Sequence, residues 1–219
     1  MAGRNTTLKS VDTNDSTKLH LNQQHAMLLH RSDKEDATTK YVNEALGRGY
    51  LTIYLSINGD NNNNNNNNNT SHTSKIALSE SIDYEENVNR GNLLTFDTRI
   101  FYNYVLTGNL QPFEELKVLI EEAIEEKRIA SKRNELKEEV IVVVIAGVAA
   151  ELNRNEKFDE CIKVEEWWQK THSEWLHKGL KVAIICPHLI PKLDKDEFTH
   201  YREAIASLHE IVVESGTEQ

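Results

Sequence analysis

A continuous apolar run over residues 140–146 most constrains how this chain can fold. It follows a long amphipathic segment that starts near Pro112. A strand that is apolar along its whole length is typical of the interior of a parallel sheet, where helices cover both faces. Many nucleotide-binding α/β proteins use such a sheet, but this sequence has no Gly-rich loop ending in Gly-Lys-Ser or Gly-Lys-Thr, and no Gly-x-Gly-x-x-Gly follows a strand. We therefore predict the scaffold of a nucleotide-using protein without its usual phosphate-binding chemistry.

Strand-like and helix-like segments alternate along the rest of the chain. The pattern predicts strands at 25–30, 50–57, 92–96, 140–146 and 181–186, with an edge strand at 209–213. Helices are predicted after the capping spacing of Ser32 and Glu35, at 74–87, from Pro112, at 158–177, and after a capping pair of Asp194 and Glu197. Strands separated by helices imply right-handed crossovers. We predict a three-layer α/β/α fold with a mainly parallel sheet, of the RecA- or Rossmann-like class.

Composition divides the chain into one domain with polar additions. Residues 1–24 carry too few apolar groups to fold and are predicted to be a disordered tail, and 214–219 a second tail. The tract of asparagines at 61–69 is predicted to lengthen a surface loop over 60–73, because extra loop residues cost little closure entropy. A single domain is predicted for 25–213.

Charge and hydropathy exclude several classes of function. The net charge is -10 and no basic stripe is present, which argues against direct nucleic-acid binding. No signal peptide opens the sequence, and its longest apolar run is about half the length that spans a bilayer. We therefore expect a cytoplasmic protein with no membrane contact. The two cysteines, Cys161 and Cys186, have no zinc-motif spacing, and Cys186 is predicted to be an ordinary buried thiol.

Polar residues cluster where the predicted strands end, which is where open α/β sheets bind ligands. One carboxylate of the pair Glu165 and Glu166 is also a candidate ligand-binding group. Adjacent helical positions point about 100° apart, so only one of the two side chains can face the core. The candidate ligand-binding residues are His30, Arg31, Ser32, Asp97, Gly147, Glu151, Glu165, Cys186 and His188.

Catalytic and metal-binding patterns are absent from the sequence. His25 and His30, and likewise His172 and His177, are five residues apart, which does not suit a shared ion, and no His-Glu-x-x-His occurs. His209 is predicted to be a hydrogen-bonded core residue, and the three tryptophans are predicted to be core. No Gly-x-Ser-x-Gly elbow is present. We expect no metal, no cofactor and no enzymatic activity.

A series of short motifs in a fixed order resembles a MEDS domain, the sensory domain named for methanogen and methylotroph proteins and a dichloromethane-responsive repressor. The resemblance spans about residues 25 to 213. Its motifs are His25 with its apolar strand, Ser32-Asp33-x-Glu35, Leu46-Gly47-Arg48-Gly49-Tyr50, the strand at 92–96, the Pro112 helix, Ala146-Gly147, Val164-Glu165-Glu166, the strand at 183–186, and Leu208-His209.

The resemblance implies a RecA/KaiC-like fold without a phosphate loop and a sensory role. Small organic molecules such as hydrocarbon derivatives are the implied signals. No DNA-binding or kinase module is recognised in the sequence, so we expect the signal to pass through a regulatory protein partner. Our leading hypothesis is a non-catalytic sensory domain that binds a small-molecule ligand, with a homodimer left open. The alternatives are a degenerate RecA/KaiC-like nucleotide-binding protein and a pure protein-interaction module.

Overall fold

The sheet has six strands, all parallel. The computed structural model describes residues 23–31, 37–56, 84–133 and 139–214. The strand order is β3-β2-β4-β5-β1-β6, and every paired strand runs parallel to its neighbour. The strands are β1 (His25–His30), β2 (Leu51–Ser56), β3 (Leu93–Asp97), β4 (Ile141–Ala146), β5 (Lys181–Leu189) and β6 (Ile211–Glu214). The predicted three-layer, mainly parallel α/β/α fold is confirmed.

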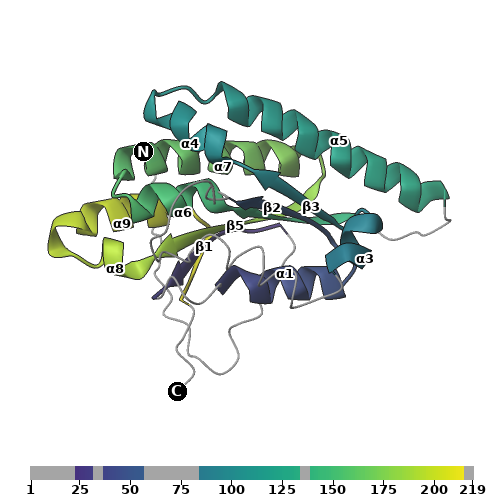
Figure 1. Cartoon of the computed structure of the whole chain (residues 1–219), viewed down its shortest axis with the longest axis horizontal. Helices are drawn as coiled ribbons and strands as arrows, with labels where there is room; N and C mark the ends of the chain where they lie inside the picture. Colours follow the sequence, from purple (N-terminus) through teal and green to yellow (C-terminus); the bar gives the residue numbers. More distant parts are fainter. Residues whose placement is uncertain (1–22, 32–36, 57–83, 134–138, 215–219) are drawn as a thin grey trace, which may run out of the picture.

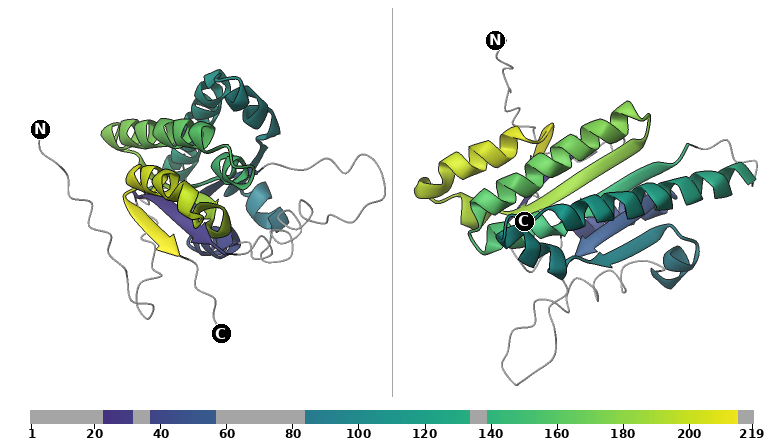
Figure 2. Two further views of the ribbon diagram at one scale, coloured as in Figure 1. Left: turned by 90° about the vertical axis from the view of Figure 1, so that its left-hand side faces the viewer. Right: turned by 90° about the horizontal axis from the view of Figure 1, so that it is seen from above.

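Helices cover both faces of the sheet (Figure 1). On one face lies α1 (Ala37–Gly47). On the other face lie α4 (Arg99–Leu106), α5 (Gln111–Arg133), α6 (Gly147–Arg154) and α7 (Phe158–His177). The short helix α3 (Tyr84–Asn89) precedes β3, and α8 (Ile190–Leu193), the 3-10 turn η1 (Asp196–Phe198) and α9 (Thr199–Ser207) connect β5 to β6. The end-on view shows α1 and the pair α5 and α7 on opposite sides of the sheet (Figure 2).

Burial follows the position of each strand in the sheet. All residues of β1 are buried, as are nearly all of β4 and β5, because these strands have a neighbour on each side and helices on each face. The outermost strands, β3 and β6, are only partly buried. The larger part of the core lies between the sheet and α5, α6 and α7, and it contains Trp167, Trp168 and Trp175. The prediction that the tryptophans are core is confirmed.

The strand β5 is longer than the sequence pattern predicted. It continues to Leu189, so Pro187 and His188 lie inside the strand and not after it. A proline is tolerated there because the pairing of β4 with β5 has already ended at Ile185, while β1 still pairs with β5 through Leu189.

The predicted capping pair of Asp194 and Glu197 is wrong. The helix α9 begins at Thr199, and the Asp194 side chain instead forms an ion pair with Arg202. Asp194 directly follows the last residue of α8. The sequence pattern did not predict three of the helices, α4, α6 and α8. Several other predictions lie outside the described residues. These are the capping spacing at 32–35, the asparagine tract and most of the helix predicted at 74–87. The two predicted tails also lie outside, except for the few residues of each that border the domain.

None of the described helices is long and apolar enough to cross a membrane.

Candidate functional site

The predicted ligand residues do not form one site, because the sheet separates them. Asp97 ends β3, which lies three strands from β5 and four from β1. At a spacing of about 4.8 Å per strand, these separations are about 14 and 19 Å. Asp97 bonds its neighbour Arg99 at 3.0 Å, and Glu151 of α6 pairs with Arg154. Ser32 lies outside the described residues.

Gly147, another predicted ligand residue, has a packing role at the start of α6. A Cβ atom added to it would lie 2.2 Å from the backbone oxygen of Leu55 in β2. Only glycine therefore allows α6 to begin this close to the end of β2.

The ends of β1 and β5 bring other predicted residues together. These strands are adjacent, and His30 pairs with Leu189 in the register. The chain after β1 leads to α1 on one face, whereas the chain after β5 leads to α9, which contacts α7 on the other face. Connections that diverge in this way mark the usual ligand position in an open α/β sheet. Asn153 of α6 and His188 lie on the α7 side of these strand ends, whereas His30, which alternates with Leu29, lies on the α1 side. We call these three residues together with Arg31 the β1/β5 site.

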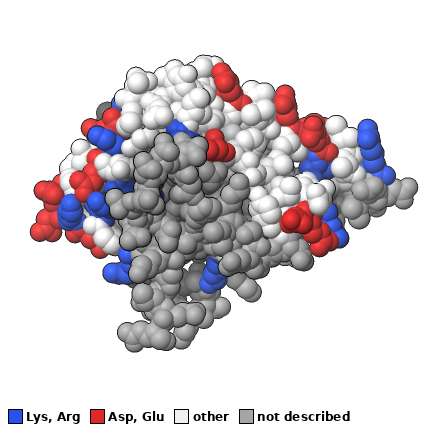
Figure 3. All heavy atoms as spheres, viewed as in Figure 1, with Lys and Arg blue, Asp and Glu red and all other residues white. Residues whose placement is uncertain are grey.

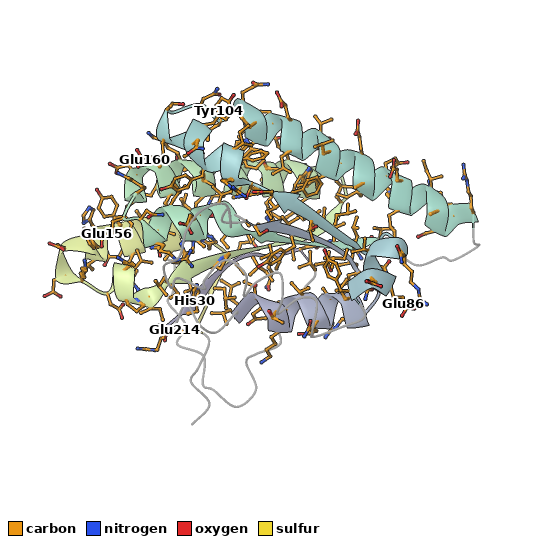
Figure 4. All side chains as sticks on the ribbon, in the orientation of Figure 1. His30, Glu86, Tyr104, Glu156, Glu160 and Glu214 are labelled. Atoms are coloured by element: carbon orange, nitrogen blue, oxygen red, sulfur yellow. The ribbon has the colours of Figure 1, made fainter. Side chains whose placement is uncertain are left out.

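Charged side chains lie at the outer side of the β1/β5 site. Arg31 is 57% exposed and lies 3.9 Å from a carboxylate oxygen of Glu214 in β6. His30 and Glu214 occupy the same end of the sheet (Figure 4), in agreement with the pairing of β1 and β6. A cationic group is therefore available beside the strand ends.

Two buried polar atoms at the end of β5 have no hydrogen-bond partner within the described part of the chain. The side-chain oxygen of Asn153 accepts the backbone N–H of Leu189 at 3.0 Å, but its Nδ2 is unpaired and the residue is fully buried. His188 donates from Nε2 to Glu165 at 3.0 Å, and its Nδ1 is unpaired. An unpaired buried donor or acceptor costs about 1–3 kcal/mol, so these atoms have hydrogen-bonding capacity that the described residues do not use.

A second group of polar side chains lies inside the core, between α7 and the sheet. Its centre is Glu165 of α7, which is fully buried, whereas Glu166 is exposed. The prediction that only one of these two carboxylates faces inward is confirmed. The Glu165 oxygens lie 3.0 Å from His188 Nε2, 3.2 Å from His209 Nε2 and 3.6 Å from His25 Nε2.

The sheet register explains why these side chains meet. Met27 pairs with Cys186 and Leu29 with His188, so His25, Cys186 and His188 all project toward α7, since alternate residues share a face. His25 Nε2 lies 3.3 Å from the Cys186 sulfur. His209 enters from the segment between α9 and β6, and its Nδ1–H donates to the carbonyl of Ile205 at 2.8 Å. This agrees with the prediction of a hydrogen-bonded core residue.

Burial and mutual attraction set the charge states of this group. Burial raises the pKa of Glu165, but the nearby His209, His188 and His25 outweigh it and hold that pKa well below its ordinary value. Burial lowers the pKa of His25 to about 4, with His209 adding to the effect and Glu165 opposing it. Burial, followed by the Glu165 charge, raises the pKa of the Cys186 thiol well above its ordinary value. The carboxylate is therefore ionised beside a neutral His25 and a neutral thiol.

Sequence reasoning selected Glu165, Cys186 and His188 but missed His25 and His209 as their neighbours. It compared only histidines close together in the sequence, and these five residues come from β1, α7, β5 and the segment before β6. The available signal was the appearance of polar residues in otherwise apolar strands.

Comparisons with known proteins support the fold only. No family model matches the sequence, and no curated protein matches it. The structure is similar to the crystal structure of the uncharacterized protein PH0321 from Pyrococcus horikoshii, determined in complex with an unknown peptide, with a TM-score of 0.51 and 12% sequence identity. The match covers 89% of this chain and 78% of that protein. The chain therefore shares a three-layer α/β/α, Rossmann-like fold with that protein.

Proposed function

We propose that this chain is a non-catalytic sensory domain that binds a small organic molecule at the β1/β5 site and signals through a protein partner. The observation that carries the proposal is the pair of unpaired buried atoms, Asn153 Nδ2 and His188 Nδ1, where two adjacent strands diverge. The resemblance to sensory domains without a phosphate loop supports the same role.

The chemistry of the β1/β5 site describes the ligand that would fit it. The amide of Asn153 offers a hydrogen-bond donor, and His188 Nδ1 offers an acceptor when Nε2 carries the proton. Arg31 adds a cation that favours a polar or anionic group at the exposed end. A small molecule with an apolar body and a polar end satisfies all three.

Native mass spectrometry of the gently purified protein tests the proposal, with Arg31→Ala as the test variant. Surface ion pairs such as that of Arg31 contribute about 0–1 kcal/mol, so this variant should fold. The control is Arg90→Ala, which removes another exposed, paired arginine at the opposite edge of the sheet, before β3. We expect an organic mass, lost on denaturation, on the wild type and on Arg90→Ala, and a lower occupancy on Arg31→Ala.

Two results would count against ligand binding at this site. The first is a wild-type protein that carries no organic mass and that no metabolite stabilises in a thermal-shift screen. The second is the same occupancy in both arginine variants, whether reduced or unchanged, because the ligand would then not depend on Arg31.

A protein-interaction module is the second candidate function, favoured by exposed apolar residues on α4 and α5. Ile100, Tyr104, Val118 and Leu119 are between 41% and 57% exposed. A largely uncharged region covers α4 and the start of α5 in the space-filling view (Figure 3). The Pyrococcus horikoshii protein was crystallised with an unknown peptide. In the same native spectra, a dimer or a bound peptide without an organic ligand would favour this second function.

A further inference from the structure

Four potential metal ligands from distant parts of the chain converge in the core. They are His25, Glu165, Cys186 and His209, each buried, and their ligand atoms all lie within 4.8 Å of one another. This distance is close enough for small side-chain movements to bring the atoms around one ion, since metal–ligand bonds are about 2.0–2.3 Å long.

The hydrogen bonds around Glu165 and His209 leave one ligand atom of each residue unused, while His25 Nε2 and the Cys186 sulfur contact each other at 3.3 Å. His209 donates its Nδ1–H to Ile205, so in the neutral ring Nε2 carries a lone pair. His188 bonds Oε1 of Glu165, which leaves Oε2 available. Glu165 Oε2 and His209 Nε2 are 3.2 Å apart, and neither atom has a hydrogen-bond partner among the described residues. Ligand histidines and carboxylates in metal sites are held by second hydrogen bonds of this kind.

Charge balance also favours a divalent cation. The described structure gives Glu165 three histidines as ion-pair partners, and a lysine or arginine is not among them. With a dication bound, the Glu165 carboxylate and the Cys186 thiolate together cancel its charge. Binding would replace the Cys186 S–H proton by the metal and release that proton to water.

The donor set indicates which metals fit. Two imidazole nitrogens, one carboxylate oxygen and one thiolate sulfur suit Zn²⁺ and similar transition metals, whereas Ca²⁺ and Mg²⁺ prefer all-oxygen sites. Four protein ligands in a fully buried place correspond to a closed, structural type of site.

We propose that His25, Glu165, Cys186 and His209 bind one zinc-like divalent transition-metal ion that links β1, α7, β5 and the segment before β6. This replaces the sequence-based expectation of no metal, which considered only histidine pairs near each other in sequence. His188 of the β1/β5 site holds Glu165 through Oε1 but is not one of the four ligands, so metal binding does not require a small molecule at that site. A second group, Cys161, Glu165 and His188, is the competing location, with three donors in place of four.

Cobalt substitution distinguishes these locations, because Co²⁺ takes zinc sites and a thiolate ligand adds an intense charge-transfer band in the near ultraviolet. The full chain is produced in medium supplemented with Co²⁺, since the site is closed in the folded protein. Its metal content and absorption spectrum are measured for the wild type, Cys186→Ser and Cys161→Ser. The two cysteines are matched controls, because both are fully buried beside Glu165.

We expect one Co²⁺ per wild-type chain with a thiolate band that persists in Cys161→Ser and disappears in Cys186→Ser. Metal retention against a competing chelator should fall about tenfold or more in Cys186→Ser and His209→Gln. A wild-type protein without stoichiometric metal and without the band would overturn the proposal. Loss of the band in Cys161→Ser alone would overturn it too, by assigning the metal to the competing group. If a variant fails to fold, the metal content and absorption spectrum of the wild type still show whether the chain binds a metal through a thiolate.

Discussion

At the scale of single residues, burial lowers the pKa of two histidines in the core, His25 and His172. His172 of α7 is buried, and its Nε2 contacts the backbone oxygen of Val182 at 2.9 Å. Burial lowers its pKa from the ordinary value of 6.5, while that backbone contact opposes the shift. Below this ordinary pKa, the unfolded chain binds a proton that the folded protein does not. Stability should therefore fall as the pH falls through 6.5.

A histidine variant tests this pH dependence. In His172→Gln, the difference in unfolding free energy between pH 7.5 and 5.5 should be smaller than in the wild type, because one neutral buried imidazole is gone. Glutamine keeps a donor for Val182. His177→Gln is the control, since His177 is exposed on the same helix. Urea titrations of all three proteins in EDTA measure the effect, and equal pH dependence in all three would refute it.

At the scale of elements, α7 organises the larger part of the core. Trp167 donates to Glu114 of α5 at 2.6 Å, and Trp175 donates to Glu121 of α5 at 2.8 Å. These bonds hold the two helices in register while the indole rings fill the space above the sheet. The same helix supplies Glu165, so its packing also places the buried carboxylate.

The junction of β4 and α6 gives an element-scale prediction. Gly147→Ala should destabilise the protein by about 1–3 kcal/mol, because the new methyl group meets the backbone of β2, which cannot rotate away. Gly47→Ala is the control: its Cβ would meet nothing within 4 Å, and alanine should change stability by less than about 1 kcal/mol, in the favourable direction. Urea midpoints measure both. Similar midpoints for the two variants would show that β2 and α6 move apart easily.

At the scale of the whole molecule, the sheet is most stable at its centre. The strands β4, β5 and β1 are almost fully buried, whereas β3 and β6 have one neighbour each and are partly exposed. Local opening needs little free energy where few apolar contacts are broken. The edges should therefore open separately from the centre.

Hydrogen exchange followed by mass spectrometry tests this order of stability. Amides of β5 should exchange only through global unfolding, and those of β6 should exchange through local opening at a rate at least about tenfold higher. Peptides that cover β1 serve as an internal comparison, because β1 lies between β5 and β6. Equal protection of β6 and β5 would mean that the edge strand unfolds only with the whole domain.

Most of the fold could be predicted because helices and strands are marked by patterns among residues that are close together in the sequence. Continuous apolar runs mark the buried strands, and apolar residues at spacings of three and four mark α5 and α7, whose end at 177 was predicted to the residue. The start of α9 was predicted wrongly because a capping spacing also occurs in turns. The helix α6 was missed because its apolar residues merge with those of β4.

The sequence by itself determined the alternation of strands and helices, the buried strands and the missing phosphate loop. Each of these features depends only on residues that are close together in the sequence. Only the tertiary structure decided the strand order, and with it which polar residues meet. Asp97 and His30 were both predicted at strand ends, yet four strand positions separate them. His25, Cys186 and His209 surround Glu165 because β5 and β6 insert on either side of β1. No local pattern encodes that arrangement, since strand pairing joins segments more than a hundred residues apart.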